Sequence, residues 1–247
     1  MCTEMDNQQL NLFTREQLQV FLASQLGDGC ITKTNSNSFY YSTNCKFEEY
    51  IDFKHTLLGD MFKKKSLLQE NGFSKTPIYV MRSKSSSQLC NIKQMSISDV
   101  ISKLDELGIA LWFYDDGSLH QRNLFYNLNT HKFSKDIQEN VFIPFFNELG
   151  IYPTLRVERK KDGRVFYYLT IGKYDGAMKI SQILSKYPVN CYSYKRWSSE
   201  TIQKWSKLQE ELKSEGIEIT NLNNFQIGKL YKGVITIQDI VRTYRKL

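Results

Sequence analysis

The chain has 247 residues, enough for one large domain or two modest ones and too many for a miniprotein held together by disulfides. Hydrophobic residues make up 41% and charged residues 24%, with only four prolines and thirteen glycines, which excludes collagen-like, low-complexity and wholly disordered chains. Lys and Arg number 33 against 26 Asp and Glu, and the net charge of +7 favours a polyanionic partner. Nucleic acid is therefore the leading class of partner.

The N-terminal residues 1–6 show neither a basic leader nor an apolar core, and no later stretch approaches ~20 uninterrupted apolar residues. We therefore expect a soluble, unsecreted protein of the cytoplasm or of an organelle matrix. The five cysteines stand too far apart for a Cys-x-x-Cys zinc pattern, and their odd number argues against a disulfide framework. We interpret them as reduced thiols.

The first element in chain order is an amphipathic helix predicted over residues 14–27. Thr14 and Gln17 form the pattern of a capping box at its start, and the helix stops at Gly27-Asp28-Gly29. Alternating apolar and polar segments separated by turn-forming residues follow it. They predict a hairpin over 30–35 and 39–47, a helix over 49–63, a second hairpin over 66–73 and 76–84, and a short helix over 85–93.

A second apolar helix, predicted over residues 105–116, also ends in an acid followed by Gly117. After it we expect a hairpin over 118–119 and 124–130, a helix over 134–149, a hairpin over 154–160 and 164–171, and a helix over 174–186. The same element order thus appears twice, with Asp28 and Asp116 88 residues apart, so the chain is interpreted as a duplicated unit.

This duplication divides the chain into an N-terminal half over residues 1–97 and a C-terminal half over residues 98–197. Residues 198–247 break the repeat. They form a C-terminal extension to which the sequence assigns no role, with a charged amphipathic helix expected over 199–215 and a short helix over 239–247.

The two acids that close the apolar helices are the first candidates for chemistry. Ala23 and Gly27 form a small-xxx-small pair, which lets another helix approach closely. If the two helices pack in register, Asp28 and Asp116 meet at one edge, where a divalent cation would offset their repulsion. Either acid alone is more simply interpreted as a helix-terminal Asp beside a Gly. The recurrence of an acid at the unfavourable end of the helix dipole favours the metal hypothesis.

Residues 21–29 (FLASQLGDG) and 109–117 (IALWFYDDG) resemble the paired signature helices of the LAGLIDADG homing endonucleases, whose single-chain members carry two. Residues 111–118, 128–130 (LNT) and 192–195 (YSYK) are particularly similar to intron-encoded monomeric members. The resemblance covers residues 14–197. It implies an α+β fold of two pseudo-symmetric αββαββα units joined through the paired helices, with two antiparallel DNA-binding sheets.

The resemblance also implies roles for individual residues. Asp28 and Asp116 correspond to the metal-binding acids of the family, and the adjoining Gly27 and Asp115 are further candidate ligands. Mg²⁺ is the expected cofactor, and Mn²⁺ is expected to substitute for it, because phosphodiester hydrolysis uses a hard cation held by carboxylates, carbonyls and waters.

Four basic residues lie near positions that the family uses around the cleaved bond. Lys93 and Lys195 stand about where the family places a basic residue beside each scissile phosphate, although a solvated surface charge explains Lys93 equally well. Lys46 and His131 fall near positions that are often Gln in the family.

Each strand of the expected sheets should alternate between a core face and an exposed face. In residues 154–160 this places Leu155 and Val157 inward, and Arg156 and Glu158 outward. A concave polar sheet on a basic protein suits the major groove of DNA, where Arg reads guanine and Asn or Gln reads adenine. The candidate DNA contacts are Lys33, Asn35, Lys46, Arg82, Lys84, Arg122, Asn127, His131, Arg156, Arg159 and Arg164.

Together these observations predict a monomeric, site-specific homing endonuclease that makes a double-strand break in a long asymmetric DNA target by Mg²⁺-dependent hydrolysis. Two alternatives stay open at this point. An RNA maturase that assists intron splicing would bind intron RNA and would need a basic surface but not both acids. A catalytically silent DNA-binding protein on the same scaffold would bind a defined duplex without nicking it. The presence of both acids favours the enzyme.

Overall fold

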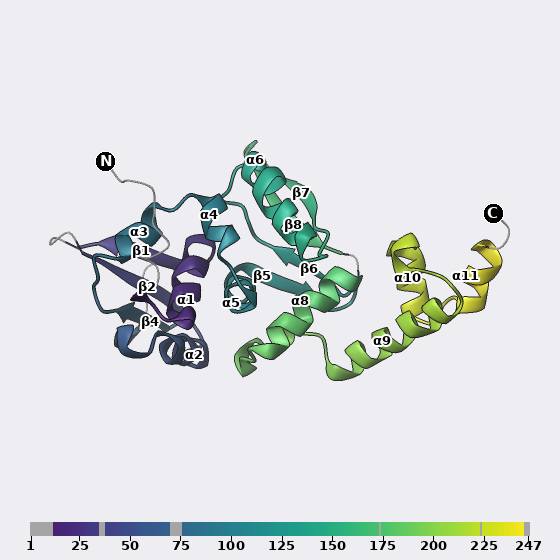
Figure 1. The fold of residues 1–247 in the computed structure, drawn as a ribbon, viewed down its shortest axis with the longest axis horizontal. Helices are drawn as coiled ribbons and strands as arrows, with labels where there is room; N and C mark the ends of the chain where they lie inside the picture. The colour runs from purple at the N-terminus through teal and green to yellow at the C-terminus, as the bar shows by residue number, and fades with distance from the viewer. Residues whose placement is uncertain (1–11, 35–37, 70–75, 173, 223, 245–247) are drawn as a thin grey trace.

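The computed structural model describes residues 12–34, 38–69, 76–172, 174–222 and 224–244. Two α+β units lie beside each other, and an arm of helices leads away from the second unit (Figure 1). The expected α+β class and the repeated order of elements are confirmed. Within the described part of the chain, none of the helices combines the length and the apolar character needed to cross a membrane.

The first unit is built around a four-stranded antiparallel sheet with the strand order β1-β2-β4-β3. Its elements are α1 (Arg15–Leu26), β1 (Gly29–Lys33), β2 (Phe39–Cys45), α2 (Glu48–Leu58), the 3₁₀ turn η2 (Gly59–Met61), β3 (Phe62–Leu68), β4 (Ile78–Ser83), α3 (Leu89–Gln94) and α4 (Ile97–Ser102).

The second unit repeats this topology with the strand order β5-β6-β8-β7. Its elements are α5 (Glu106–Asp116), β5 (Gly117–His120), β6 (Phe125–Leu128), α6 (Lys135–Ile137), the π-helical turn η3 (Gln138–Phe142), α7 (Ile143–Glu148), β7 (Thr154–Arg159), β8 (Val165–Ile171), α8 (Tyr174–Lys186) and the 3₁₀ turn η4 (Asn190–Lys195).

The residues after the second unit form three helices and one 3₁₀ turn. They are α9 (Ser199–Ser214), η5 (Ile219–Asn221), α10 (Asn224–Tyr231) and α11 (Ile237–Tyr244). We call residues 198–244 the C-terminal arm. Helix α10 was not predicted. The final helix, predicted over 239–247, begins earlier, at Ile237, and residues 245–247 lie outside the described part of the chain.

Three other elements differ from the sequence prediction. The helix expected over 49–63 ends at Leu58 because Gly59 adopts a positive φ of 51°, and β3 consequently begins at Phe62. The helix expected over 134–149 is interrupted by η3 just before Pro144, which has no backbone N–H to donate. The short helix α4 was not predicted, although Ser96 caps it by accepting from the Asp99 N–H.

Helix α5 lies at the centre of the molecule, between α1 and α8 (Figure 1). Eight successive residues, from Leu107 to Tyr114, are buried, which explains why this helix is apolar on all sides rather than along one stripe. The core therefore continues from one unit into the other through α1 and α5. Their packing fixes the positions of the residues at the ends of both helices.

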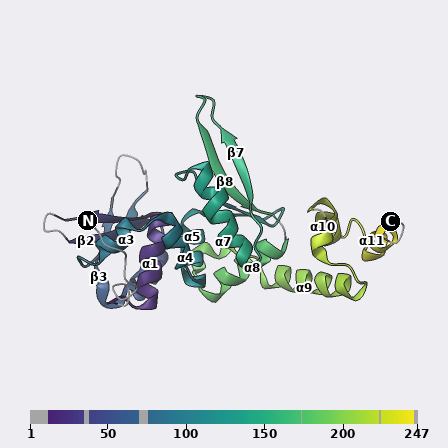
Figure 2. The same cartoon turned by 45° about the horizontal axis from the view of Figure 1, so that its top comes forward.

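Core-facing residues of both sheets are buried, and the predicted alternation fails at the end of one hairpin. Ile31, Tyr41, Leu128 and Leu169 are buried, as expected for core-facing positions. Val157, which was expected to face inward, is 50% exposed. The reason is that β7 and β8 project as a long hairpin beyond the helices that cover the sheet (Figure 2), so no core remains for Val157 to face.

Candidate active site

Helices α1 and α5 approach each other closely along their length. A Cβ atom on Gly27 would lie 2.7 Å from the Cβ of Asp115, so only a glycine fits at this position without a shift. At the other end, Gln19 accepts a hydrogen bond from the Asp105 N–H at 3.1 Å and donates one to the Lys103 carbonyl at 3.0 Å. These contacts hold the helices in register, and the register brings their acidic ends together.

Asp115 is the buried member of the acidic cluster. Both of its oxygens accept from the Lys54 Nζ, at 2.9 and 3.1 Å, and the Tyr50 hydroxyl donates to it at 2.6 Å. The Asp28 backbone N–H also points to it, at 3.3 Å. Burial alone would lower the pKa of Lys54, but the Asp115 carboxylate outweighs this effect and raises it above its ordinary value. With its oxygens occupied in this way, Asp115 does not fit the role of metal ligand that the sequence suggested.

Asp28 follows the end of α1 and Asp116 ends α5, both next to the buried Asp115. Within the described part of the chain, neither carboxylate accepts a hydrogen bond or forms an ion pair. Partial burial, and then the charge of Asp115, raise the pKa of Asp28. Burial, followed by the charges of Asp28 and Asp115, raises the pKa of Asp116 to about 7. The two carboxylates are thus close enough to repel each other.

The charges of Asp28 and Asp116 affect the pKa values of two lysines, Lys195 and Lys132. Lys195, the predicted basic residue of the second half, is buried, and its Nζ donates to the carbonyls of Phe113 and Tyr114 at 3.3 and 2.6 Å. It therefore caps the negative end of α5. Burial lowers the pKa of Lys195 to about 8, against the opposing effect of the nearby acids.

Lys132 is the second of these lysines, and the sequence did not single it out. Its Nζ donates to the Gly27 carbonyl at 3.0 Å, so it reaches from the second half to the end of α1. Burial lowers its pKa, while the charges of Asp116 and Asp28 oppose the shift. Lys93, which is exposed, lines a cavity of about 250 Å³ together with Lys132. The cavity also borders Gly29, the residue after Asp28.

The donor set at the acidic ends is small. No group of three or more His, Cys, Asp or Glu side chains able to hold a metal is found among the residues described. Asp28 and Asp116 nevertheless fit a hard divalent cation, because Mg²⁺ is usually held by one or two carboxylates, with water and substrate phosphate oxygens completing its coordination. The absence of any protein partner on either carboxylate, among the residues described, agrees with such a role.

The outer face of the second sheet presents a polar ladder. Asn127 and Thr170 are paired across β6 and β8, and the Thr170 hydroxyl donates to the Asn127 side chain at 2.8 Å. Arg156 on β7 stands opposite Tyr168 and is exposed. Two of the predicted contacts, Asn127 and Arg156, therefore share one face.

The first sheet carries a corresponding basic face. Arg82 on β4 lies opposite Lys64 on β3, and Lys64 was not among the predicted contacts. The Arg82 guanidinium lies 5.4 Å from the ring centre of Tyr40. The remaining candidates are spread over strand ends and turns. Asn35 lies outside the described residues, and the exposed candidates on strand ends and turns are Lys33, Lys84, Arg122, Arg159 and Arg164.

The contacts described for Lys46 and His131 are with residues other than Asp28 and Asp116. Lys46 is exposed, with its Nζ 4.7 Å from the ring centre of Phe47. His131 faces the outer hairpin, where its ring lies 5.5 Å from Phe166 and its Nε2 lies 3.7 Å from Glu158. The neighbouring residue, Lys132, is the one that points to the acidic ends.

The paired apolar helices, the acids at their ends and the two antiparallel sheets define a single-chain, duplicated α+β protein of the LAGLIDADG type. The model of the LAGLIDADG DNA endonuclease family matches residues 18–178, well over half of the chain. The chain therefore belongs to this family. No curated protein matches the chain by sequence.

The fold is similar to that of a solved homing endonuclease. I-WcaI bound to its DNA recognition sequence is 16% identical over 79% of this chain and 95% of that chain, with a TM-score of 0.59. Two further structures match with lower scores. I-DmoI in complex with DNA and Mn is 16% identical over 70% of this chain and 98% of that chain, with a TM-score of 0.46. The N-terminal LAGLIDADG domain of DUF199/WhiA is 10% identical over 71% of this chain and 85% of that chain, with a TM-score of 0.43.

Proposed function

We propose that this protein is a site-specific endonuclease that cleaves both strands of a long, asymmetric DNA target with the help of a divalent cation, Mg²⁺ above all. The observation that carries the proposal is the convergence of Asp28 and Asp116, two carboxylates without partners among the described residues, at the junction of two similar units. This electrostatically unfavourable pair favours a cation-dependent enzyme over a protein that only binds nucleic acid.

The reaction adds water across a phosphodiester. A water oxygen forms a bond to phosphorus, the bond from phosphorus to the leaving oxygen breaks, and the water proton leaves to solvent or to the leaving oxygen. A divalent cation at the acids would help to activate that water and to stabilise the charge on the leaving oxygen. The protein's own residues have two roles in this step. Asp28 and Asp116 hold the cation, and Lys132 and Lys195 place positive charge beside the phosphate.

DNA binding is assigned to the outer faces of the two sheets. Arg82 and Lys64 on the first sheet and Arg156 and Asn127 on the second supply the cations and the amide that major-groove recognition uses. Because the two units differ in sequence at these positions, each half of the target should be read differently. One chain then recognises an asymmetric site.

The direct test is cleavage of DNA that carries a target selected by the wild-type chain from a randomised duplex library. Asp28→Asn and Asp116→Asn should each lower the rate with Mg²⁺ at least about 100-fold, because the cation is worth several kcal/mol of transition-state stabilisation. Asp136→Asn, an exposed acid on α6, is the matched control and should cut like the wild type.

The outcomes separate the candidate functions. An equally active Asp28→Asn/Asp116→Asn double variant would eliminate the metal mechanism. Tight, salt-sensitive binding by the wild type, without nicking in Mg²⁺ or Mn²⁺, would instead support a silent DNA-binding protein.

A further inference from the structure

The C-terminal arm lies outside the part of the chain that the family model matches, which ends at residue 178. Its connection to the second unit is nevertheless firm. Trp197 is 4% exposed, and its backbone N–H donates to the buried Ser181 hydroxyl at 2.7 Å. Ser198 then caps α9 by accepting from the Thr201 N–H at 3.1 Å. The sixteen residues of α9 span about 24 Å and carry the rest of the arm to the outer end of the second sheet.

The arm has a small apolar core of its own. Trp205 and Leu212 on α9, Ile227 and Leu230 on α10, and Ile240 on α11 are all buried. On α10, positions 227 and 230 lie three residues apart and therefore share one buried face, and the ring of Tyr231 on the same helix lies 6.1 Å from that of Trp205 on α9. This packing fixes which face of α10 is turned away from the arm.

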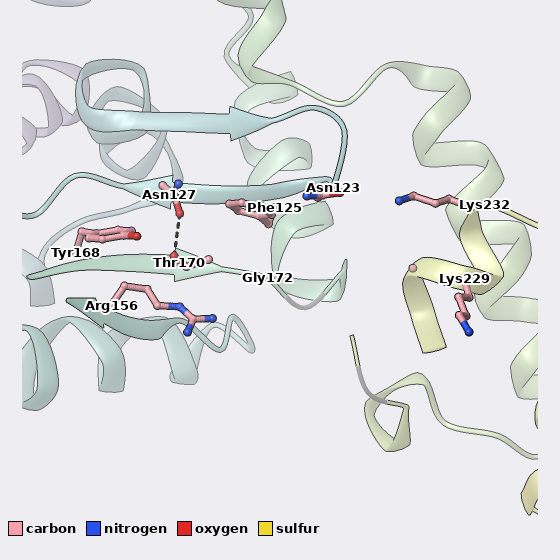
Figure 3. Close-up of a pocket in the computed structure, with 10 residues that line it drawn as sticks. Asn123, Phe125, Asn127, Arg156, Tyr168, Thr170, Gly172, Lys229 and Lys232 are labelled. Atoms are coloured by element: carbon pink, nitrogen blue, oxygen red, sulfur yellow. Dashed lines mark hydrogen bonds between the residues drawn. The ribbon is translucent and has the colours of Figure 1, made fainter. Parts of the chain in front are cut away.

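That second face of α10 points toward the DNA-binding sheet. It borders a groove of about 490 Å³ between α10 and the β5–β8 sheet, and Figure 3 shows Lys232 directed across the groove toward Asn123. The polar residues that line the groove include Asn123, Asn127, Arg156, Thr170, Lys229 and Lys232.

The charged residues that line this groove are all positive. Three of the ten residues that line it are cations, Arg156 from the sheet and Lys229 and Lys232 from the arm, and none of the ten is acidic. Lys232 reaches across the groove from the arm and Arg156 lies on the sheet side, so positive charge lies on both walls of the groove. Two of the sheet residues on this groove, Asn127 and Arg156, also belong to the face already assigned to DNA. The groove is therefore continuous with that face and is complementary to a polyanion.

We propose that α10 is an additional DNA-contact element, in which Lys229 and Lys232 bind the phosphate backbone where the target leaves the second sheet. This inference rests on the proposed function, because it takes duplex DNA as the ligand of the sheets. No corresponding arm is attached to the first unit in the described residues, so the protein should cover more of its target on the side of the second unit.

The test compares two full-length double variants that remove the same charge. Lys229→Gln/Lys232→Gln alters the groove, whereas Lys207→Gln/Lys213→Gln removes two exposed lysines of α9 that do not line it. The probe is the duplex that the wild-type chain selects from a randomised library. Binding is measured over a range of salt concentrations, and the protected nucleotides are mapped by hydroxyl-radical footprinting.

The groove variant should bind roughly tenfold more weakly at 0.1 M salt. Its slope of log affinity against log salt should be shallower by about 2, because each of the two lysines neutralises one phosphate in the wild-type complex. It should also lose protection at one outer edge of the footprint. The control variant should keep the full footprint.

A groove variant with the salt slope and footprint of the control would overturn this inference while leaving the proposed function intact. Failure of the wild type itself to bind any duplex would overturn both.

Discussion

Asp115 and Asp116 are adjacent in the sequence but have opposite surroundings. Successive residues of a helix point about 100° apart, so Asp115 turns toward α2, where Lys54 neutralises it and Tyr50 donates a hydrogen bond to it. Asp116 has neither partner, and the charge of Asp28 contributes to its raised pKa. Asp115 thereby joins the two units, because Lys54 belongs to the first and Asp115 to the second. Asp116 is left available to a cation.

The Lys54–Asp115 ion pair should matter strongly for stability, because its side chains are only 3% and 2% exposed. Lys54→Met leaves a buried, uncompensated carboxylate and should lower the free energy of unfolding by about 3–5 kcal/mol. Lys54→Met/Asp115→Asn, which removes both charges, should be more stable than Lys54→Met alone. Denaturant unfolding measures both effects.

Lys65→Met provides the comparison, because Lys65 forms a more exposed ion pair with Glu48 and Asp52. Its loss should cost less than about 1 kcal/mol. Equal losses from the Lys54 and Lys65 variants would contradict the assigned role of the buried pair.

The raised pKa of Asp116 predicts a dependence of stability on pH. The folded protein keeps this proton up to a pKa of about 7, whereas the unfolded chain releases it near the ordinary value of 3.8. The folded state therefore binds more protons between these values, and the metal-free protein should lose stability as the pH rises from about 4 to about 7.

The Asp116→Asn variant should not show this loss of stability. At pH 8 its free energy of unfolding should be higher than that of the wild type by about 1–2 kcal/mol, after allowance for solvent screening. Denaturation at pH 5 and pH 8 without metal measures the difference. A variant less stable than the wild type at pH 8 would show that Asp116 has a stabilising partner.

The residues of the site were only partly predictable from the sequence. The equivalent places of Asp28 and Asp116 at the ends of two packed helices could be predicted because the helix ends recur along the chain. The roles of Asp115 and Lys132 could not, because their partners Lys54 and Gly27 are distant in sequence and are brought near only by the packing of α1 against α5. His131, which the family resemblance placed near a position that is often Gln, contacts the outer hairpin, whereas the neighbouring Lys132 reaches the end of α1.

At the scale of elements, the contact of α1 with α5 determines the spacing of the two acids. Gly27→Ala would place a methyl group 2.7 Å from the Asp115 side chain. The helices would have to separate, at an expected cost of about 1–3 kcal/mol in unfolding free energy. Cleavage should fall as well, even when measured well below the unfolding temperature. Full activity in a destabilised Gly27→Ala protein would show that the spacing tolerates change.

Most elements followed from local sequence signals. The capping box of Thr14 and Gln17 and the hairpin turn around Gly163 gave correct positions for α1, β7 and β8. The positive φ of Gly59, which ends α2, is a local feature that apolar periodicity does not report. Helix α10 was missed because its two apolar contacts become a pattern only once α9 and α11 provide the other side of the core.

At the scale of the whole molecule, both acids and both sheets belong to one chain. We therefore expect one chain to bind one duplex, with no need for a second copy. Sedimentation velocity or native mass spectrometry of the complex should give one chain per duplex over a wide range of protein concentration. Two chains per duplex would mean that each unit acts with its counterpart from another copy.

The claim on which the others depend is that Asp28 and Asp116 hold a divalent cation beside the DNA backbone. The most direct measurement is anomalous scattering from Mn²⁺ in crystals of the protein with its selected duplex. We predict manganese density in contact with the carboxylates of both residues and with a phosphate oxygen, and none in crystals of the Asp28→Asn/Asp116→Asn variant. Density at other residues, or equal density in the variant, would contradict the account.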